Sequence, residues 1–594
     1  EMVDLFEKAI RLEGTYKSQG KHAAGVIIAA SPLANMCPMV RDSEGSPVAG
    51  FEMTDLEAIG QVKFDFLGVD VLTKIQKIAK HGNLNLTNLE DQLAWDLICS
   101  GETKGVFQLE SKTGSTWAKR VKPRNIEEIS ALVSLIRPGT LNAYFEGKSM
   151  AQHYVDRKSG KDEVKYLHPA LEPILKDTYG VLVYQEQSML IAKEIAGFTE
   201  QEADNLRKAI GKKLADLMAK LKITFLEGCK NKGIVSEAEA AQIFDWIEAS
   251  NRYSFNKSHG VSYGMTAYMS AICKARNILK FYEVYLDHAR RKQDTQEEIK
   301  ALIYDARIHN IEVYPPRIGN LYKDFTIIRD SVYYGISLVK DIGQAESEKI
   351  IELIQNSDNT KTMSWIEILA KYSGEINKKA FIAMINTGCF DGHGRPSRNT
   401  MLYEYDIWRS LSDREAQFIS SNIESTENLL HHLNVLVNNF KISKPRLDKI
   451  MGLIKILQKP TNDLNDYAAW IARVEEKHMG VAMTCCASDM GSSDLVDTQC
   501  KEIYQGVSTG ACHLGVTINT IREFVIKKEG KNQGKKMAFL SVSDNTAILD
   551  SVIMFPDSYE KYKRLLYENN TVILFGQPSR EKNGGFIVDK VYQI

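Results

Sequence analysis

The spacing of apolar residues changes at Gly506, and this change limits the C-terminal part of the chain to a β-sheet fold. Apolar and polar residues alternate from there on, in segments at 514–518, 537–542, 549–553, 571–575 and 585–588. Alternation places every second side chain on the same face of a strand. A helical stretch, Ser558 to Tyr567, separates the third segment from the fourth. Five strands with a helix in this place have the order of an OB-fold β-barrel, which we expect over residues 496–594.

The length of 594 residues predicts roughly three to five domains. A hydrophobic content of 44% and a charged content of 25% are typical of soluble globular proteins. No apolar run reaches the ~18 residues that a membrane span needs, so we expect no membrane partner. The net charge of −1 does not exclude nucleic acid, because local clusters of Lys and Arg decide such binding. Nine cysteines without a Cys-x-x-Cys pair predict reduced thiols rather than zinc ligands or disulfides.

A second constraint lies at 61–68, in the sequence Gln-Val-Lys-Phe-Asp-Phe-Leu-Gly. In a strand, Lys63 and Asp65 share one face, and Phe64 and Phe66 share the other. Burying a carboxylate among phenylalanines is costly unless the carboxylate is paired or binds a cation. The segment is therefore either a plain Lys63–Asp65 salt bridge or part of a cation site.

Six further motifs accompany this strand in a fixed order: Lys21–Ala29, Gly105–Ser111, Arg137–Gly139, Tyr184–Gln187, Leu206–Lys213 and Phe255–His259. The ordered series resembles the alpha subunit of bacterial DNA polymerase III, the replicative polymerase of the C family. The resemblance extends from near residue 10 to the C-terminus and is weak at about 400–475. We identify the chain as a member of this family.

The resemblance implies a multidomain α+β protein. Residues 1–70 would be the C-terminal part of a nucleotidyltransferase-type (polymerase beta-like) palm, and 71–320, rich in helical periodicity, the mostly α-helical fingers. Residues 321–400 would hold a tandem helix-hairpin-helix, although two ordinary helical hairpins fit the same pattern. The first hairpin would turn at 340–343, and the second would extend from 376–379 to the turn at 388–392. Residues 401–495 would be a helical linker with a candidate clamp-binding region, ahead of the OB fold.

The implied activity is template-directed addition of dNTPs to a primer 3′ end by two-metal phosphoryl transfer. The family's third catalytic carboxylate corresponds to Asp65, a ligand of the two Mg²⁺ ions, and its triphosphate-contacting lysine to Lys63. The other two carboxylates form an upstream Asp-x-Asp pair in the family, which the first 60 residues here do not contain. We therefore expect a second polypeptide with the rest of the palm, the thumb and the N-terminal domain, as in a split polymerase, in preference to an excised fragment. The alternative function is a non-catalytic DNA-binding scaffold.

In the implied fingers, Leu206–Lys213 is similar to the family's Leu-Arg-Arg-Ala-Met-Gly-Lys-Lys. Arg207 keeps the first arginine of the dNTP-binding pair, and Lys208 replaces the second without its planar fork. The same resemblance assigns DNA contacts to Lys212, Lys213, Lys257 and His259. The alternative for the lysines is a solvated basic helix face. We expect His22 to lie in the core.

In the barrel, four phenylalanines lie among basic residues, a composition that suits single-stranded template. The phenylalanines are Phe524, Phe539, Phe555 and Phe586, and the candidate DNA contacts are Lys527, Lys528, Lys535 and Lys536. Some of these rings must fill the barrel core, so we expect one or two to be available for stacking.

The expected partners are primer-template DNA, dNTPs and the second polypeptide, with a sliding clamp as a further candidate. Two segments, Gln417–Ile419 and Gln458–Pro460, match the family's clamp-binding peptide poorly. The expected location is the cytoplasm of a bacterium or of a host cell infected by a bacteriophage.

Overall fold

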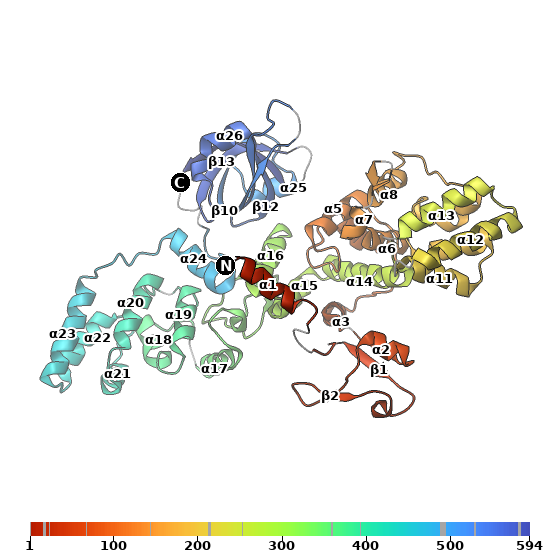
Figure 1. The fold of residues 1–594 in the computed structure, drawn as a ribbon. Coiled ribbons are helices and arrows are strands. Elements are labelled where there is room, and N and C mark those ends of the chain that lie inside the picture. The colour runs from red at the N-terminus through yellow and green to blue at the C-terminus, as the bar shows by residue number, and fades with distance from the viewer. Residues whose placement is uncertain are drawn as a thin grey trace. The chain divides into compact units, whose positions relative to one another are not determined.

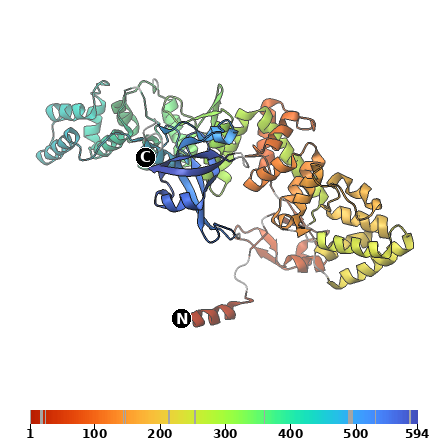
Figure 2. The same ribbon diagram turned by 90° about the horizontal axis from the view of Figure 1, so that it is seen from above.

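The computed structural model describes residues 2–15, 20–22, 24–66, 68–142, 144–145, 147–211, 215–251, 254–357, 360–392, 394–486, 495–527, 530–579 and 584–593. They form two compact units, residues 1–73 and 74–594 (Figures 1 and 2). Among the described residues, no helix has the length and apolar character of a membrane span. Mostly helical segments and a separate β-barrel confirm the expected multidomain α+β class.

The first unit contains short elements: α1 (Met2–Leu12), β1 (Gly25–Ile28), β2 (Met39–Arg41), β3 (Pro47–Ala49), α2 (Met53–Ala58) and β4 (Val62–Asp65). β1 and β4 form an antiparallel pair in which Gly25 lies opposite Asp65 and Ile28 opposite Val62. β2 pairs with β3 in the same sense. The strand expected around Lys63 and Asp65 is therefore confirmed.

The first unit has a small core. Its buried apolar residues, among those described, are Cys37, Leu56 and Val71. One face of the β1–β4 pair is apolar and exposed over Val26, Ile28, Val62 and Phe64. In α1, five residues spaced as one helix face are also exposed: Met2, Leu5, Phe6, Ala9 and Ile10. Three buried apolar side chains are too few to stabilise a domain of this length by themselves.

The second unit begins with a helical region. Its main elements are α3 (Asp70–Gly82), α4 (Gln92–Ser100), α5 (Lys112–Val121), α6 (Ile126–Leu135), α7 (Pro138–Leu141), β5 (Tyr144–Phe145), β6 (Lys148–Ser149), α8 (Met150–Lys158), α9 (Glu172–Leu175), α10 (Gln185–Ala196), α11 (Glu200–Gly211), α12 (Ala215–Lys232), α13 (Glu237–Asn251), α14 (Lys257–Arg276), α15 (Ile278–His288) and α16 (Thr295–Ile308). One core lies among α4, α6 and α14, and another among α10 to α13.

Small residues bring α14 close to α6. A Cβ added at Gly260 would lie 2.8 Å from Ser134 Oγ, and one at Gly264 would lie 2.8 Å from Ser130 Oγ. Ser130 and Ser134 donate to backbone carbonyls of α6 itself, so they remain satisfied at this close contact. The glycines therefore fix the position of the N-terminal end of α14, which carries two of the expected site residues.

A third region follows, with a small sheet and a run of helices: β7 (Glu312–Tyr314), β8 (Thr326–Ile328), β9 (Ser331–Tyr333), α17 (Gln344–Gln355), α18 (Trp365–Tyr372), α19 (Lys378–Asn386), α20 (Arg398–Trp408), α21 (Asp413–Ser420), α22 (Leu429–Asn439), α23 (Lys444–Gln458) and α24 (Ala468–Met479). α17 begins directly after the expected turn at 340–343, and α19 precedes the expected turn at 388–392. The helices expected at 401–475 are likewise confirmed.

The C-terminal region is the expected barrel. After α25 (Cys500–Gln505) come β10 (Cys512–Val525), β11 (Lys536–Ser543), β12 (Ile548–Met554), α26 (Pro556–Tyr562), β13 (Thr571–Pro578) and β14 (Gly585–Gln593). The strands close in the order β10-β11-β12-β14-β13, with only β12 and β14 parallel. The helix before β13 was expected at 558–567 but lies two residues earlier, because Pro556 favours the first helical turn.

The barrel contacts α16. Tyr304 Oη donates to Asp544 O at 3.0 Å, and Lys501 Nζ donates to Arg307 O at 2.7 Å. Burial raises the pKa of Tyr304, so this hydroxyl stays a neutral donor.

Candidate functional site

Lys63 and Asp65 lie side by side on β4, as their spacing predicts. Lys63 Nζ is 2.9 Å from Asp65 Oδ1. The Asp65 side chain is 50% exposed, whereas the Lys63 side chain is only 17% exposed. The expectation that Asp65 is buried among phenylalanines is therefore wrong: Phe64 and Phe66 are exposed too, with ring centroids 6.4 Å apart.

His22 also contacts Asp65, which corrects its expected place in the core. Its Nδ1 lies 3.5 Å from Asp65 Oδ1, and the side chain is 56% exposed. Gly25, opposite Asp65 on β1, leaves room for this cluster, since a Cβ there would lie 2.5 Å from Lys63 Cε and 3.0 Å from His22 Nδ1. One carboxylate oxygen thus faces two nitrogen groups at the open edge of the pair.

Asp65 fits Mg²⁺ as one ligand of a larger set. Within the described ranges, no group of three or more His, Cys, Asp or Glu residues has the geometry of a metal site. Asp65 Oδ1 lies beside Lys63 and His22, whereas Oδ2 has no ion-pair or hydrogen-bond partner among the described residues. Mg²⁺ binds through a few carboxylates with waters and substrate phosphates, so a site that included Asp65 would need further ligands.

Arg207 and Lys208 lie on α11, where they share a carboxylate that sequence reasoning missed. Arg207 donates from Nε and Nη2 to Asp204 Oδ1 at 3.0 and 2.8 Å, and Lys208 Nζ lies 2.7 Å from Asp204 Oδ2. Hydrogen bonds from Lys208 and then Arg207 lower the pKa of Asp204. A triphosphate that binds these cations would compete with Asp204 for them. Lys212 and Lys213 lie outside the described residues.

The N-terminal end of α14 brings Lys257 and His259 together with aromatic rings. Asn256 caps the helix, since its Oδ1 accepts from His259 N at 2.9 Å. The His259 ring stacks on Tyr263 with centroids 4.0 Å apart, and Lys257 Nζ lies 5.7 Å from the Tyr184 ring centroid. Both site residues are exposed.

Arg137, from a separate motif, joins the same cluster. Its guanidinium lies 4.0 Å from the Phe255 ring centroid, and its Nε donates to Ser134 O at 3.1 Å. Burial lowers the pKa of Arg137. The cluster therefore combines cationic groups with ring faces, which suits phosphates next to bases.

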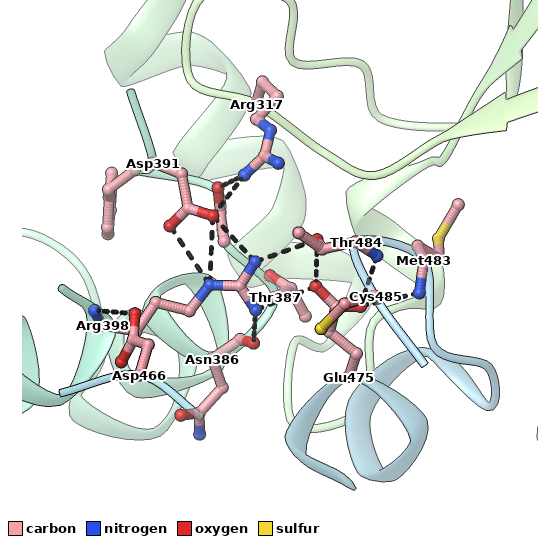
Figure 3. Close-up of polar contacts among 12 residues, drawn as sticks. Arg317, Asn386, Thr387, Asp391, Arg398, Asp466, Glu475, Met483, Thr484 and Cys485 are labelled. Atoms are coloured by element: carbon pink, nitrogen blue, oxygen red, sulfur yellow. Dashed lines mark hydrogen bonds and ion pairs between the residues drawn. The ribbon is translucent and has the colours of Figure 1, made fainter. Parts of the chain in front are cut away.

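The two hairpin turns are held by polar networks. In Figure 3, Arg398, almost fully buried, donates to Glu475 Oε1 at 2.9 Å, to Asp391 Oδ2 at 2.7 Å and to Asn386 O at 3.0 Å. Asp391 Oδ2 also lies 2.9 Å from Arg317 Nη1. Because Asp391 belongs to the 388–392 turn, this network fixes that turn to α20 and α24.

Polar contacts also support the first turn, at 340–343. His478 lies near the end of α24, and its Nε2 is 3.1 Å from Asn386 Nδ2. Lys340 N donates to His478 O at 2.8 Å. Asp341 takes a positive φ of 75°, a conformation that aspartate tolerates better than most residues. The Gly343 N-cap of α17 has no side-chain cap, and no atom lies within 4 Å of its Cβ position. The start of α17 is therefore open to an anion such as a phosphate.

On the barrel, three of the four phenylalanines are on the surface. Phe586 is fully buried in the core, whereas Phe524, Phe539 and Phe555 are exposed. The sequence predicted that one or two of the four rings would be exposed, so the structure has one more than the upper number. Phe524 and Phe539 lie on neighbouring strands with centroids 6.4 Å apart, and Arg522 is opposite Phe539. β10 and β11 thus carry an aromatic and basic face.

The lysines beside this face differ in their partners. Lys536 Nζ is 2.8 Å from Glu523 Oε2, and Lys535 Nζ is 3.4 Å from Asp557 Oδ1. Lys527 is exposed, and its side chain has no ion-pair partner among the described residues. Lys528 lies outside them.

The segments examined for a clamp-binding peptide are part of helices. Phe418 and Ile419 lie in α21, where Ile419 is buried. Gln458 ends α23. A helical segment with a buried apolar residue does not offer the extended peptide that such a motif requires, so neither segment gains support.

Known protein families match three parts of this chain. Residues 1–68 match the bacterial DNA polymerase III alpha NTPase domain, 69–233 the bacterial DNA polymerase III alpha subunit finger domain, and 310–401 a helix-hairpin-helix motif. Three curated relatives share the name DNA polymerase III subunit alpha. The chain is 32% identical to the one from Aquifex aeolicus over 100% of its own length and 47% of the relative's. The chain belongs to the bacterial DNA polymerase III alpha subunit family.

The other two relatives are from Escherichia coli K12, with 29% identity over 98% of the chain and 49% of the relative, and Thermus aquaticus, with 37% identity over 66% and 32%. The chain thus spans about half the length of the alpha subunits that it matches most fully. The family match confirms the resemblance and the helix-hairpin-helix motif. The domain boundaries expected from the sequence stay predictions.

Within this polymerase III alpha chain, the structure brings some of the expected site residues together. Lys63 contacts Asp65, and Arg207 and Lys208 share Asp204. Lys257 and His259 lie near the same helix end but contact different rings, those of Tyr184 and of Tyr263. Asp204 and Tyr263 were not expected. The contacts of Asp204 could have been predicted from the sequence, since Asp204 precedes Arg207 by three residues and Lys208 by four, the spacing of neighbours on one helix face.

Proposed function

We propose that the chain forms part of a replicative DNA polymerase, which adds dNTPs to a primer 3′ end by two-metal phosphoryl transfer. It would contribute part of the palm, the fingers, the tandem hairpins and the OB barrel. The observation that carries this proposal is the open carboxylate of Asp65 beside Lys63 on a strand with a family palm sequence. Its partners would be primer-template DNA and dNTPs, with a sliding clamp as a further candidate, in the cytoplasm of a bacterium or of an infected host.

Asp65 and Lys63 would have complementary roles. When bound, Mg²⁺ ions neutralise the charge that develops on the attacking and leaving oxygens. Asp65 would hold such an ion through Oδ2, the oxygen that Lys63 leaves open. Lys63, fixed by its largely buried stem, would direct its ammonium toward the triphosphate. Arg207 and Lys208 would bind the triphosphate from α11, Arg207 with its planar fork.

We further propose that a second polypeptide, or a segment absent from this chain, completes the palm. Two observations support this. Among the described residues, Asp65 belongs to no group of three or more His, Cys, Asp or Glu residues that could hold a metal ion. The first unit also exposes Val26, Ile28, Val62 and Phe64 on one sheet face, an area that a completed domain would bury.

The alternative, a non-catalytic DNA-binding scaffold, is favoured by one observation. Lys63 Nζ already neutralises Asp65, as a purely structural ion pair would. In that case Asp65 would have no role in extension.

The substitution Asp65→Asn separates the two. In the completed enzyme we expect primer extension to slow by orders of magnitude, because the metal ligand loses its charge. Binding of primer-template, measured by fluorescence anisotropy, should stay within about two-fold because phosphate contacts are few at this position. The fold should lose at most about 1 kcal/mol, since the ion pair is half-exposed and solvent screens it.

Asp55→Asn, on the exposed surface of α2, is the matched control and should keep full extension. Normal extension by the Asp65→Asn enzyme would favour the scaffold. Extension by the chain alone, without an added palm half, would show that the catalytic carboxylates lie elsewhere in this sequence.

A further inference from the structure

Lysines gather on α23, a helix in the region where the sequence resemblance is weak. Residues 441–459 contain Lys441, Lys444, Arg446, Lys449, Lys455 and Lys459, against a single acid, Asp448. The chain as a whole carries a net charge of −1. The segment 441–459 therefore has a local excess of positive charge that the chain as a whole does not have.

The five lysines have no carboxylate partners in the part of the chain that the structure describes, and all five are exposed. Some other surface lysines are paired, as Lys222 is with Asp245, Lys323 with Glu348 and Lys378 with Asp406. A row of neighbouring like charges is unfavourable by itself, because the ammonium groups repel one another. We call the face formed by Lys444, Lys455 and Lys459 the α23 lysine face. Lys459 is the C-cap of α23, and Lys449 lies about 140° around the helix from Lys444.

The rest of α23 is firmly held, so the face has a fixed position. Ile450 and Ile454 are buried, and α23 packs against α22 (Figure 1). Arg446, the one paired cation, donates to Glu415 Oε1 of α21 at 2.7 Å and to Ser410 O at 2.8 Å. Lys444, Lys455 and Lys459 fall within an arc of about 60° around the helix, since each residue advances it by about 100°.

The length of the face indicates the kind of partner. Lys444 and Lys455 are eleven residues apart, about 16 Å along the axis, and Lys459 lies about 6 Å further. A point-like anion cannot contact all of them, but one strand of duplex DNA carries a charge every ~3.4 Å of its axis. α23 buries Ile450 and Ile454 and exposes Met451 and Ile456, so the test below includes anionic vesicles to separate duplex DNA from a membrane surface.

We propose that the α23 lysine face binds the phosphate backbone of duplex DNA. The proposal rests on the proposed function, and it extends DNA binding beyond the helix-hairpin-helix motif at 310–401. α21 packs against α18 of that region and against α22. The hairpin turns and α23 therefore belong to the same compact unit of the protein.

The test uses the full chain and a fluorescein-labelled primer-template with a duplex of roughly 30 base pairs. Lys455→Gln/Lys459→Gln removes two charges from the face, and glutamine keeps the helix propensity of lysine. We expect binding about ten-fold weaker at ~0.1 M salt, with the slope of log Kd against log salt smaller by nearly two. Asp448→Asn, which adds to the positive charge of the face, should bind more tightly.

The control Lys176→Gln/Lys230→Gln removes two exposed lysines away from α23 and should change the affinity by less than two-fold. Equal circular dichroism spectra and melting curves would show that all variants are folded. Unchanged DNA binding by Lys455→Gln/Lys459→Gln would overturn the inference alone, as would a loss confined to vesicles of phosphatidylglycerol. Failure of the unmodified chain to bind primer-template would overturn the proposed function together with this inference.

Discussion

At the scale of single residues, Asp204 is the group that changes how the fingers are understood. It holds both cations that would bind the triphosphate, at distances of 2.7 to 3.0 Å. Under the proposed function, this partly exposed carboxylate would act as a competing anion: it would keep Arg207 and Lys208 in place until a triphosphate displaces it.

The substitution Asp204→Asn tests this competition in the completed enzyme. We expect the apparent KM for dNTP to fall by about two- to five-fold with little change in kcat, because exposed ion pairs are weak and a triphosphate replaces them at modest cost. Steady-state primer extension at varied dNTP concentration measures it. Glu200→Gln, which affects only the pair with Lys193, serves as the control. A higher KM for Asp204→Asn would show that the carboxylate orients the cations instead.

Single residues also show how much of the candidate site can be predicted from the sequence. The shared face of Lys63 and Asp65 follows from strand periodicity, and their contact was predicted correctly. Whether Asp65, His22 and the two phenylalanines are buried depends on what packs against β1 and β4, which local sequence does not contain. Asp204 was within reach, since its spacing to Arg207 and Lys208 is a helix signal.

At the scale of elements, the barrel and the hairpins were predictable for different reasons. Alternation with period two identifies strands, so β10 to β14 appeared near their expected positions. Glycine punctuation located the turns before α17 and after α19. The polar support of those turns was not predictable, because Arg398 contacts Glu475 from 77 residues away.

α20 contains a buried acid that makes the stability of this region depend on pH. Burial raises the pKa of Glu404 to about 7 from its ordinary 4.5. Between these values the folded chain holds a proton that the unfolded chain has lost, so the free energy of unfolding falls as the pH rises from about 4.5 to 7 and then levels off.

The substitution Glu404→Gln should remove this dependence. Relative to the unmodified protein, the variant should gain up to about 3 kcal/mol across that pH range, at ~1.4 kcal/mol per pKa unit. Urea unfolding followed by tryptophan fluorescence from pH 5 to 8 measures the difference. Glu352→Gln, on the exposed side of α17, should give a constant offset. A flat difference for Glu404→Gln would mean that water reaches this carboxyl group.

At the scale of the whole molecule, stability is unequal between the two units. The second unit has extended apolar cores, whereas the described part of the first buries only Cys37, Leu56 and Val71 among its apolar residues. Regions with few buried contacts open at low free-energy cost.

Limited proteolysis of the isolated chain should therefore cut within residues 2–66 before any site in the second unit. An added palm half should slow these cuts by about ten-fold or more, since binding to the folded form suppresses local opening. Val62→Lys, on the exposed sheet face, should abolish the protection, while Met53→Lys, exposed on α2, should preserve it. Equal protection in both variants would show that the partner does not cover this face.

Within the part of the chain that the structure describes, β1 and β4 pair only with each other, so the outer edge of each strand has unpaired backbone donors and acceptors. Such edges pair readily with other chains, including further copies of the same one. Under the proposal of a second polypeptide that covers this sheet, an excess of the present chain over that partner would promote self-association instead of complex formation. The amounts in which the two chains are made would then have to match, and the two-stranded sheet would be the structural reason for that match.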